Sequence, residues 1–230
     1  MTPDSPLFRK YTDFVLYWEG DRSSDPNDGA ADCAPYPGAV HTVKGVTYCT
    51  FYHNADALGF QKTYERFLAL TNADVAQFIW LFYEDVDGPE LPDHVGLALL
   101  EASWLSGRER AVKHLQDALN AMGADPRLAV DGIIGPKTRA ALAALDPDQV
   151  IDLFYEYEGF RQQYLDYLTT FPQYAGYKNG WNNRMDMFLQ KLGPTHSSAA
   201  GPIGFGVAGG LLLLAIALAA TTPKARKQRA

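Results

Sequence analysis

The sequence lacks the short motifs on which the commonest hydrolase and transferase sites depend. It contains no HExxH pair, no GxSxG elbow and no glycine-rich phosphate loop, so zinc-dependent hydrolysis, serine acyl transfer and phosphoryl transfer are not indicated. Its five histidines are scattered along the chain, and no paired Cys/His spacing is present. The sequence therefore predicts neither a metal site nor a cofactor.

Basic residues are scarce where acidic residues are abundant. All 27 acidic residues precede position 195, together with 16 of the 20 lysines and arginines, so this part of the chain carries a net charge of about −11. Because phosphate binding depends on clustered lysine and arginine, nucleic acid is not expected as a partner. The chain contains 47% hydrophobic and 20% charged residues, which is typical of globular proteins and excludes disorder of the whole chain.

Charge is absent from residues 197–222, and residues 201–220 form an almost entirely apolar run. Twenty helical residues span roughly 30 Å, the thickness of the hydrocarbon core of a bilayer. Four basic residues follow, as they do where a membrane helix ends on the cytoplasmic side. We therefore expect a transmembrane helix over 201–222 that anchors the protein in a lipid bilayer, and its glycines would let two copies pair as a homo-oligomer. The alternative is a buried helix of a soluble protein. No signal peptide is expected at the N-terminus.

Helical periodicity dominates the rest of the chain, which predicts a mainly α fold. A first helix is expected to begin at Pro6 after the N-cap Ser5 and to end at Gly20. Further helices are expected over 57–70, 73–85, 93–106, 107–122, 136–145, 147–168 and 181–192. Between the first two helices, a polar loop over 21–40 and a run rich in Val, Thr, Tyr and Phe over 41–52 predict one small β-hairpin.

The two cysteines, Cys33 and Cys49, enclose a loop of about 16 residues. A disulfide between them would stabilise the fold by roughly 3 kcal/mol and would require an oxidising compartment. Two unpaired thiols in a reducing compartment are the alternative, and the sequence leaves both open.

A pair of carboxyl groups in different surroundings is the feature that could carry chemistry. Glu19 lies at the end of an apolar helix beside Trp18, where apolar surface and the helix dipole favour the protonated form. Asp25 and Asp28 follow on a wet loop, where a carboxylate stays ionised. Glycoside hydrolysis uses such a pair, one group to protonate the leaving oxygen and one to activate water. A solvated helix end followed by an ordinary loop is the plain structural alternative.

Four short runs of the chain resemble one enzyme family. They are Trp18-Glu19-Gly20, Ser24-Asp25-Pro26-Asn27-Asp28-Gly29, Thr42-Val43-Lys44-Gly45-Val46-Thr47 and Gly180-Trp181-Asn182-Asn183-Arg184. In this order they resemble glycoside hydrolase family 108, N-acetylmuramidases with EGGY, DPxDxGG and TxxGIT patterns that are accompanied by a peptidoglycan-binding domain. The resemblance covers about residues 8–190 and implies a lysozyme-like helical body.

The resemblance implies a role for each matching residue. Glu19 aligns with the catalytic glutamate and would be the general acid. Asp28, nine residues later, would be the second carboxylate, with Asp25 as the alternative. Thr42 would stand near the attacking water, with Thr47 as the alternative. The two alternative residues would otherwise contact the substrate.

The chain departs from the family pattern at two places. Asp21 and Arg22 stand where the family has Gly-Tyr, so an additional carboxylate follows the catalytic motif. Residues 31–40 read as an insertion that contains Cys33, which Cys49 could pin to the hairpin.

In the second half of the chain, the resemblance implies that Trp181 stacks on a sugar face and that Asn182 and Arg184 hydrogen-bond the substrate. Core packing at the start of a helix is the plain alternative for Trp181. The expected protein is a peptidoglycan hydrolase of the lysozyme type that cleaves the β-1,4 bond of glycan strands. A lytic transglycosylase and a non-catalytic wall-binding membrane protein are the alternatives.

The expected organisation is a catalytic domain over 1–95, a helical peptidoglycan-binding domain over 96–193, a linker over 194–200, the membrane helix over 201–222 and a basic tail over 223–230. This combination suggests a phage enzyme for lysis or for entering the host. The helix would lie in a host or virion membrane, with the body facing the cell wall.

Overall fold

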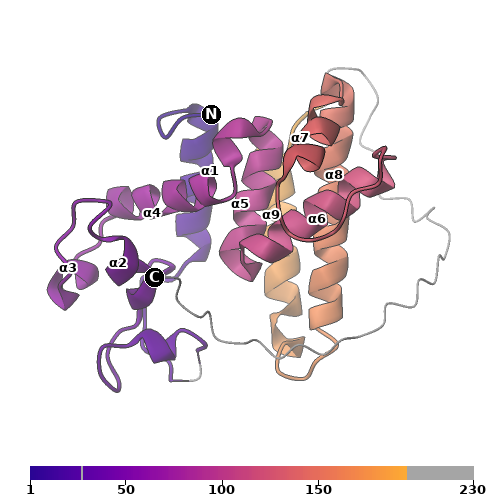
Figure 1. The fold of residues 1–230 in the computed structure, drawn as a ribbon. Helices are drawn as coiled ribbons and strands as arrows, with labels where there is room; N and C mark the ends of the chain where they lie inside the picture. Colours follow the sequence, from indigo (N-terminus) through magenta and orange to yellow (C-terminus); the bar gives the residue numbers. More distant parts are fainter. Residues whose placement is uncertain (27, 196–230) are drawn as a thin grey trace. The chain divides into compact units, whose positions relative to one another are not determined.

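The computed structural model describes residues 1–26 and 28–195, most of which are helical (Figure 1). The α-helices of this part are α1 Pro6–Trp18, α2 Tyr48–Asn54, α3 Tyr64–Leu68, α4 Asn72–Asp85, α5 Asp93–Ser106, α6 Arg108–Ala121, α7 Pro136–Ala143, α8 Pro147–Leu168 and α9 Lys178–Leu192. The short elements are the strands β1 Arg22–Ser23, β2 Thr42–Val43 and β3 Val46–Thr47, and the 3-10 helices η1 Ala31–Cys33, η2 Gly88–Glu90 and η3 Ala175–Tyr177. The expectation of a mainly helical body with a small β element is confirmed.

None of the helices within residues 1–26 and 28–195 has the length and apolar character needed to cross a bilayer. The expected membrane helix over 201–222 and the basic tail over 223–230 lie outside the described residues. The same holds for most of the expected linker, 194–200.

Helix α1 begins and ends as its sequence predicts, within two residues. The Ser5 hydroxyl accepts a hydrogen bond from the Phe8 amide at 3.3 Å, and Pro6 occupies the first turn. The helix ends one residue before Glu19, whose backbone is extended and whose amide still donates to the Val15 carbonyl at 2.9 Å. Glu19 is therefore the C-cap residue of α1, at the point where the backbone leaves the helix.

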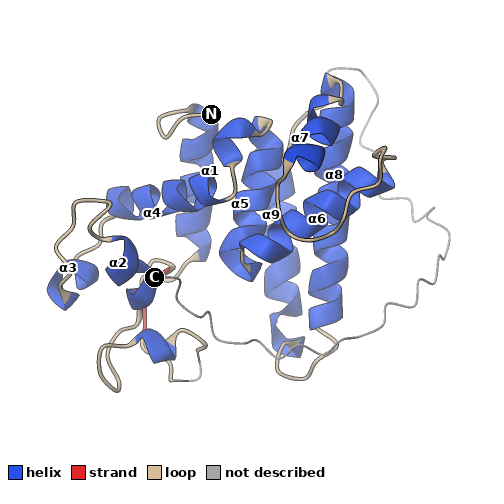
Figure 2. Cartoon of the chain, viewed as in Figure 1, coloured by secondary structure: helices blue, strands red, loops and turns tan. Residues whose placement is uncertain are grey.

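The small sheet is antiparallel in the order β1-β2-β3, with Arg22 opposite Val43 and Thr42 opposite Thr47 (Figure 2). The turn between β2 and β3 consists of Lys44 and Gly45, both with positive φ, as a two-residue hairpin requires. Strand β1 was not expected from the sequence.

The predicted extent of the hairpin, 41–52, is wrong at its C-terminal end. The Thr47 side chain accepts a hydrogen bond from the Thr50 amide and starts α2, so residues 48–52 are helical. The predicted helix over 57–70 is also too long. Gly59 has a φ of +71°, and only the residues after the N-cap Thr63 are helical. Helix α9 starts at Lys178, three residues earlier than predicted.

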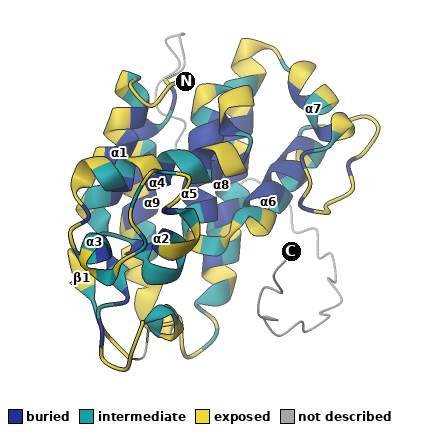
Figure 3. Ribbon diagram, turned by 60° about the vertical axis from the view of Figure 1, so that its left-hand side comes forward, coloured by how far each residue is buried: buried dark blue, intermediate teal, exposed yellow. Residues whose placement is uncertain are grey.

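Helix α5 is the centre of the core. Its residues 95–103 are all buried, and it packs against α4, α6 and α8 (Figure 3). Helix α1 packs against α9, so the first and last helices of the described residues are neighbours. The contacts of α1 with α9 and of α4 with α5 cross the expected domain boundary near residue 95, and the described residues fall in one compact unit. The division into a catalytic and a wall-binding domain stays a prediction.

Candidate active site

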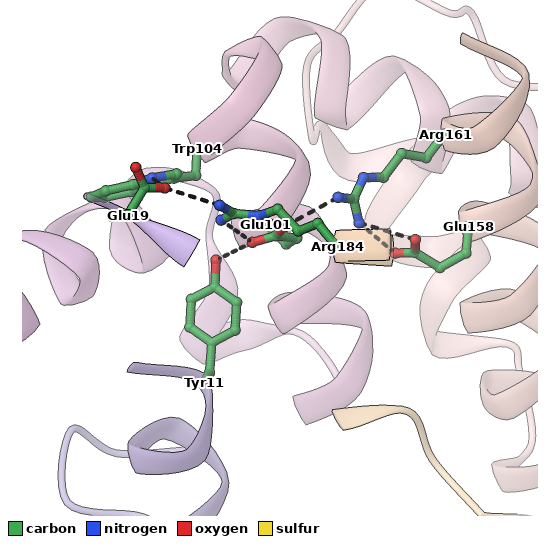
Figure 4. A network of polar contacts seen from close by, with 7 residues as sticks. All are labelled: Tyr11, Glu19, Glu101, Trp104, Glu158, Arg161 and Arg184. Carbon is green, nitrogen blue, oxygen red and sulfur yellow. Dashed lines mark hydrogen bonds and ion pairs between the residues drawn. The ribbon is translucent and has the colours of Figure 1, made fainter. Parts of the chain in front are cut away.

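The Glu19 carboxylate is held at the end of α1 by two donors from distant helices. The indole Nε1 of Trp104 on α5 and the guanidinium Nη1 of Arg184 on α9 each donate a hydrogen bond of 3.0 Å (Figure 4). Both bonds end on the same oxygen, Oε1. The Glu19 side chain is 20% exposed, so solvent reaches part of it. The two hydrogen bonds therefore fix the orientation of the Glu19 carboxylate, and part of the side chain stays accessible to solvent.

The hairpin turn lies directly on Glu19. A β-carbon at position 45 would lie 2.8 Å from Cγ of Glu19, and the φ of Gly45 is +81°. Glycine is therefore required here both by its backbone conformation and by the close approach. The TxxGIT-like run is thus brought against the catalytic candidate by the fold.

Asp21, the departure from the family pattern, is paired with the same turn. Its carboxylate lies 3.0 Å from Nζ of Lys44, and its carbonyl accepts a hydrogen bond from the Lys44 amide at 3.0 Å. The hydrogen bond and the positive charge of Lys44 lower the pKa of Asp21. This additional carboxylate therefore has its own cationic partner.

The two candidates for the second carboxylate lie on one exposed loop. Asp28 accepts a hydrogen bond from the Ala30 amide at 3.0 Å, and its own amide donates to the Asp25 carbonyl at 3.1 Å. These local bonds shape the turn and leave the Asp28 side chain exposed to solvent.

His41 is a residue that sequence reasoning missed. It is only 1% exposed, its Nε2 lies 3.1 Å from the Asp25 carbonyl oxygen, and its Nδ1 lies 3.0 Å from Oγ1 of Thr42. Because a carbonyl only accepts, Nε2 donates, and the Nδ1 of a neutral ring accepts from the Thr42 hydroxyl. His41 therefore joins the acidic loop to β2. The signal in the sequence was its position directly before the TxxGIT-like run.

Thr47 has a different role from Thr42. Its hydroxyl caps α2, accepting from the Thr50 amide at 3.1 Å and donating to the Thr50 hydroxyl at 3.0 Å.

Cys33 and Cys49 form a disulfide with their Cα atoms 5.1 Å apart, which ties η1 to α2.

A buried charge network lies behind Glu19, centred on Glu101 of α5 (Figure 4). The Glu101 side chain is fully buried and accepts hydrogen bonds from the Tyr11 hydroxyl at 2.9 Å, from Nε of Arg184 at 2.7 Å and from Nη2 of Arg161 at 3.2 Å. Arg161 also pairs with Glu158 at 3.0 Å. The network thus joins α1, α5, α8 and α9.

Burial and ion pairing act on the pKa values of this network in opposite directions. Burial raises the pKa of Glu101, but the Arg184 and Arg161 charges and hydrogen bonds outweigh it and hold the value below the ordinary range. Burial also raises the pKa of Glu158, here to about 7, against the opposing charge of Arg161. The direction of each pKa shift therefore depends on how many cations face the carboxylate, which are Arg184 and Arg161 for Glu101 and Arg161 alone for Glu158.

Arg184 connects the network to the candidate site. Nε and Nη2 bind Glu101, Nη1 binds Glu19, and the guanidinium lies 5.4 Å from the centroid of the Phe14 ring. The side chain is 7% exposed, so two carboxylates occupy most of the guanidinium that the sequence assigned to substrate.

The other two expected substrate residues of α9 lie at its first turns. Trp181 is half-buried and stacks on Tyr177, with ring centroids 5.6 Å apart. The Asn182 side-chain oxygen accepts a hydrogen bond from Gln162 on α8 at 3.1 Å. Their roles toward a substrate stay predictions.

Two further features bear on the site. Within residues 1–26 and 28–195 there is no cluster of three or more His, Cys, Asp or Glu side chains that could hold a metal ion. A surface groove of about 670 Å³ lies between α1 and α4, and Glu19 is not among its lining residues.

Comparison with known proteins points to the bacterial cell wall. Residues 110–186 match the family described as "Predicted Peptidoglycan domain". This third of the chain supports a peptidoglycan-related function, with peptidoglycan as the partner. No curated protein matches the chain.

Among solved structures, SagA of Brucella abortus is similar to this chain, with a TM-score of 0.56 and 24% sequence identity. The similarity covers 80% of this chain and 92% of SagA. At this identity the likeness shows a shared fold.

Proposed function

We propose that the protein is a peptidoglycan hydrolase of the N-acetylmuramidase type, with Glu19 as the general acid. The observation that carries the proposal is the arrangement of the Glu19 carboxylate. Both hydrogen-bond donors act on Oε1, so Oε2 can carry the proton for the leaving glycosidic oxygen. The side chain is one-fifth exposed, beside the hairpin turn.

The ion pair with Arg184 is compatible with a protonated Glu19. Glu101 binds the Arg184 guanidinium through hydrogen bonds of 2.7 and 3.1 Å and supplies its countercharge. A neutral Glu19 therefore leaves Arg184 paired with Glu101, and its carbonyl oxygen still accepts from Trp104 and Arg184.

The second carboxylate is proposed to be Asp28. It lies on an exposed loop that water reaches, where a carboxylate can activate water or stabilise the positive charge of the transition state. His41 holds the loop at the Asp25 carbonyl and accepts from Thr42, which keeps the Thr42 oxygen free to accept from the attacking water. Water adds to the sugar carbon and gives its proton to Asp28, while the bond from that carbon to the glycosidic oxygen breaks and the oxygen leaves with the proton of Glu19.

The substrate is proposed to be the β-1,4 bond between N-acetylmuramic acid and N-acetylglucosamine. Trp181 and Asn182 are proposed to contact the strand, because both lie within one turn of Arg184 on α9. The match of residues 110–186 to a peptidoglycan family supports this choice of polymer. The expected membrane helix, 201–222, would hold the body beside the wall, as a phage lysis or entering enzyme requires.

The substitution Glu19→Gln tests the proposal. Glutamine keeps the acceptor for Trp104 and Arg184 but has no proton to give, so turnover should fall by about 10²–10⁴-fold. The measurement is the loss of turbidity of purified cell walls. Glu65→Gln, at an exposed position on α3, is the matched control and should behave like the wild type.

Three outcomes separate the competing functions. A Glu19→Gln variant as active as the wild type would exclude the acid role. A wild type that binds walls without clearing them would indicate a non-catalytic wall-binding protein. Mass spectrometry of the released fragments distinguishes hydrolysis, which leaves reducing ends, from a lytic transglycosylase, which leaves anhydro ends.

A further inference from the structure

The turn between α8 and α9 carries an exposed aromatic cluster. The rings of Tyr177 and Trp181 are stacked, with planes inclined by 18°, and the ring centroid of Tyr174 lies 6.2 Å from that of Trp181. Tyr177 is 58% exposed and Tyr174 is 38% exposed. A single exposed aromatic residue needs no explanation, but a contiguous group of rings marks an interaction site.

The polar residues of the stretch around this cluster include several side-chain amides, and none is acidic. Residues 167–185 contain no acid, although the chain has 27 acidic residues before position 195. The side-chain amides of this stretch are Gln173, Asn179, Asn182 and Asn183. Amides beside flat ring faces suit an amino sugar, whose C–H face packs on an aromatic ring and whose hydroxyl and acetamido groups form hydrogen bonds.

Other partners fit the cluster less well. A nucleic acid requires clustered cations, whereas this stretch offers only Lys178 and Arg184, and Arg184 is occupied by Glu101 and Glu19. A cationic partner would require carboxylates, which the stretch lacks. A neutral polymer of amino sugars matches both the rings and the amides.

The cluster lies at the N-terminal end of α9, the helix whose Arg184 contacts Glu19. Phe188 packs against Tyr11 and Phe14, whereas Arg184 contacts Glu19, so α9 runs antiparallel to α1. The N-terminal end of α9 therefore projects past the residue that caps α1. Figure 1 shows the α8–α9 turn at the lower end of α9.

We infer that Tyr174, Tyr177 and Trp181 form an aromatic platform that binds the sugar rings of a peptidoglycan strand next to Glu19. The platform extends the proposed site along the strand, and it rests on the proposed function for the identity of the polymer. Tyr177 offers the most exposed ring, so it contributes most of the binding that does not involve the motif residue Trp181.

The test measures binding of glycan strands freed of their stem peptides, using the full chain with Glu19→Gln so that the strands stay intact. Adding Tyr177→Ala should weaken binding about 10-fold, whereas Tyr177→Phe keeps the ring and should stay within about twofold. Tyr52→Ala is the matched control, because Tyr52 is an exposed tyrosine of α2, 47% accessible. Tyr174→Ala is a second platform variant and should weaken binding less than Tyr177→Ala.

The inference and the proposed function fail in different ways. If both alanine variants of the platform bind strands as tightly as their parent, or if the parent binds no strands, the platform is excluded. If Tyr177→Ala loses binding while the chain with native Glu19 clears no walls, the platform stands as a binding site and the muramidase proposal falls. Thermal unfolding of each variant shows that a loss of binding is not a loss of fold.

Discussion

The charged residues behind Arg184 and those of the loop that follows α1 differ in their surroundings. Behind Arg184, Glu101, Glu158 and Arg161 are at most 3% exposed, and their charges face one another. The loop that carries Asp28 is exposed, and its hydrogen bonds are largely to its own backbone. A buried carboxylate with several donors is fixed and serves the fold, whereas an exposed one stays accessible to water and substrate. Burial and hydrogen-bond partners, more than residue type, therefore distinguish the carboxylates that stabilise the fold from those that a substrate can reach.

The largest effect is expected from breaking the buried side of this comparison. Glu101→Gln removes the countercharge of Arg161 and Arg184 inside the core and should lower the free energy of unfolding by about 3–5 kcal/mol. Urea unfolding monitored by tryptophan fluorescence measures it. Glu109→Gln is the control, because that carboxylate is 75% exposed and pairs with Lys113 at the surface, so it should cost under about 1 kcal/mol. A Glu101→Gln loss as small as the control's would mean that the network adds no stability.

On the exposed loop, replacing a carboxylate by an amide should lower activity and leave stability unchanged. Asp28→Asn should slow wall clearing by about 100-fold or more, because an amide neither activates water nor stabilises positive charge. Its unfolding should match the wild type within about 0.5 kcal/mol, as for other exposed substitutions. Asp25→Asn should have the smaller effect on activity. If Asp25→Asn inactivates the protein and Asp28→Asn does not, the two assignments are exchanged.

The long helices could be predicted from sequence, and the short elements could not. Periodicity over 93–106 and 147–168 spans several turns, so each helix is specified by its own residues. Between residues 41 and 70 the elements are two to seven residues long, and single side chains decide their ends. The hydroxyls of Thr47 and Thr63 start α2 and α3, and hydrophobic pattern alone does not show which threonine caps a helix.

The position of Glu19 at a helix end was predictable, but its partners were not. Arg184 is 165 residues away and reaches Glu19 only because α9 packs antiparallel on α1. Periodicity identifies the buried face of a helix without identifying the helix it meets. One signal was present: Glu101 interrupts an apolar helix, and a carboxylate in such a helix requires a buried cation. His41 offered a weaker signal of another kind, its position directly before the TxxGIT-like run.

A smaller effect than that of Glu101→Gln is a pH dependence that arises from Glu158. Burial raises its pKa from 4.5 to about 7, so the folded state binds this proton more readily than the unfolded state. Its contribution to stability is complete below pH 4.5 and is lost as the pH rises through 7, on the order of 3 kcal/mol in total. His114 acts in the opposite direction, because burial lowers its pKa to about 4 and stability falls as the pH drops below 6.5.

Glu158→Gln separates these two effects. The substitution removes only the carboxyl group, so His114 contributes equally to both proteins and cancels in their difference. The free energy of unfolding of the wild type, relative to Glu158→Gln, should decrease between pH 5 and pH 8. A difference that stays constant over this range would show that Arg161 keeps Glu158 ionised throughout. The buried network would then hold two carboxylates against two arginines, and the contrast with the exposed loop would rest on accessibility alone.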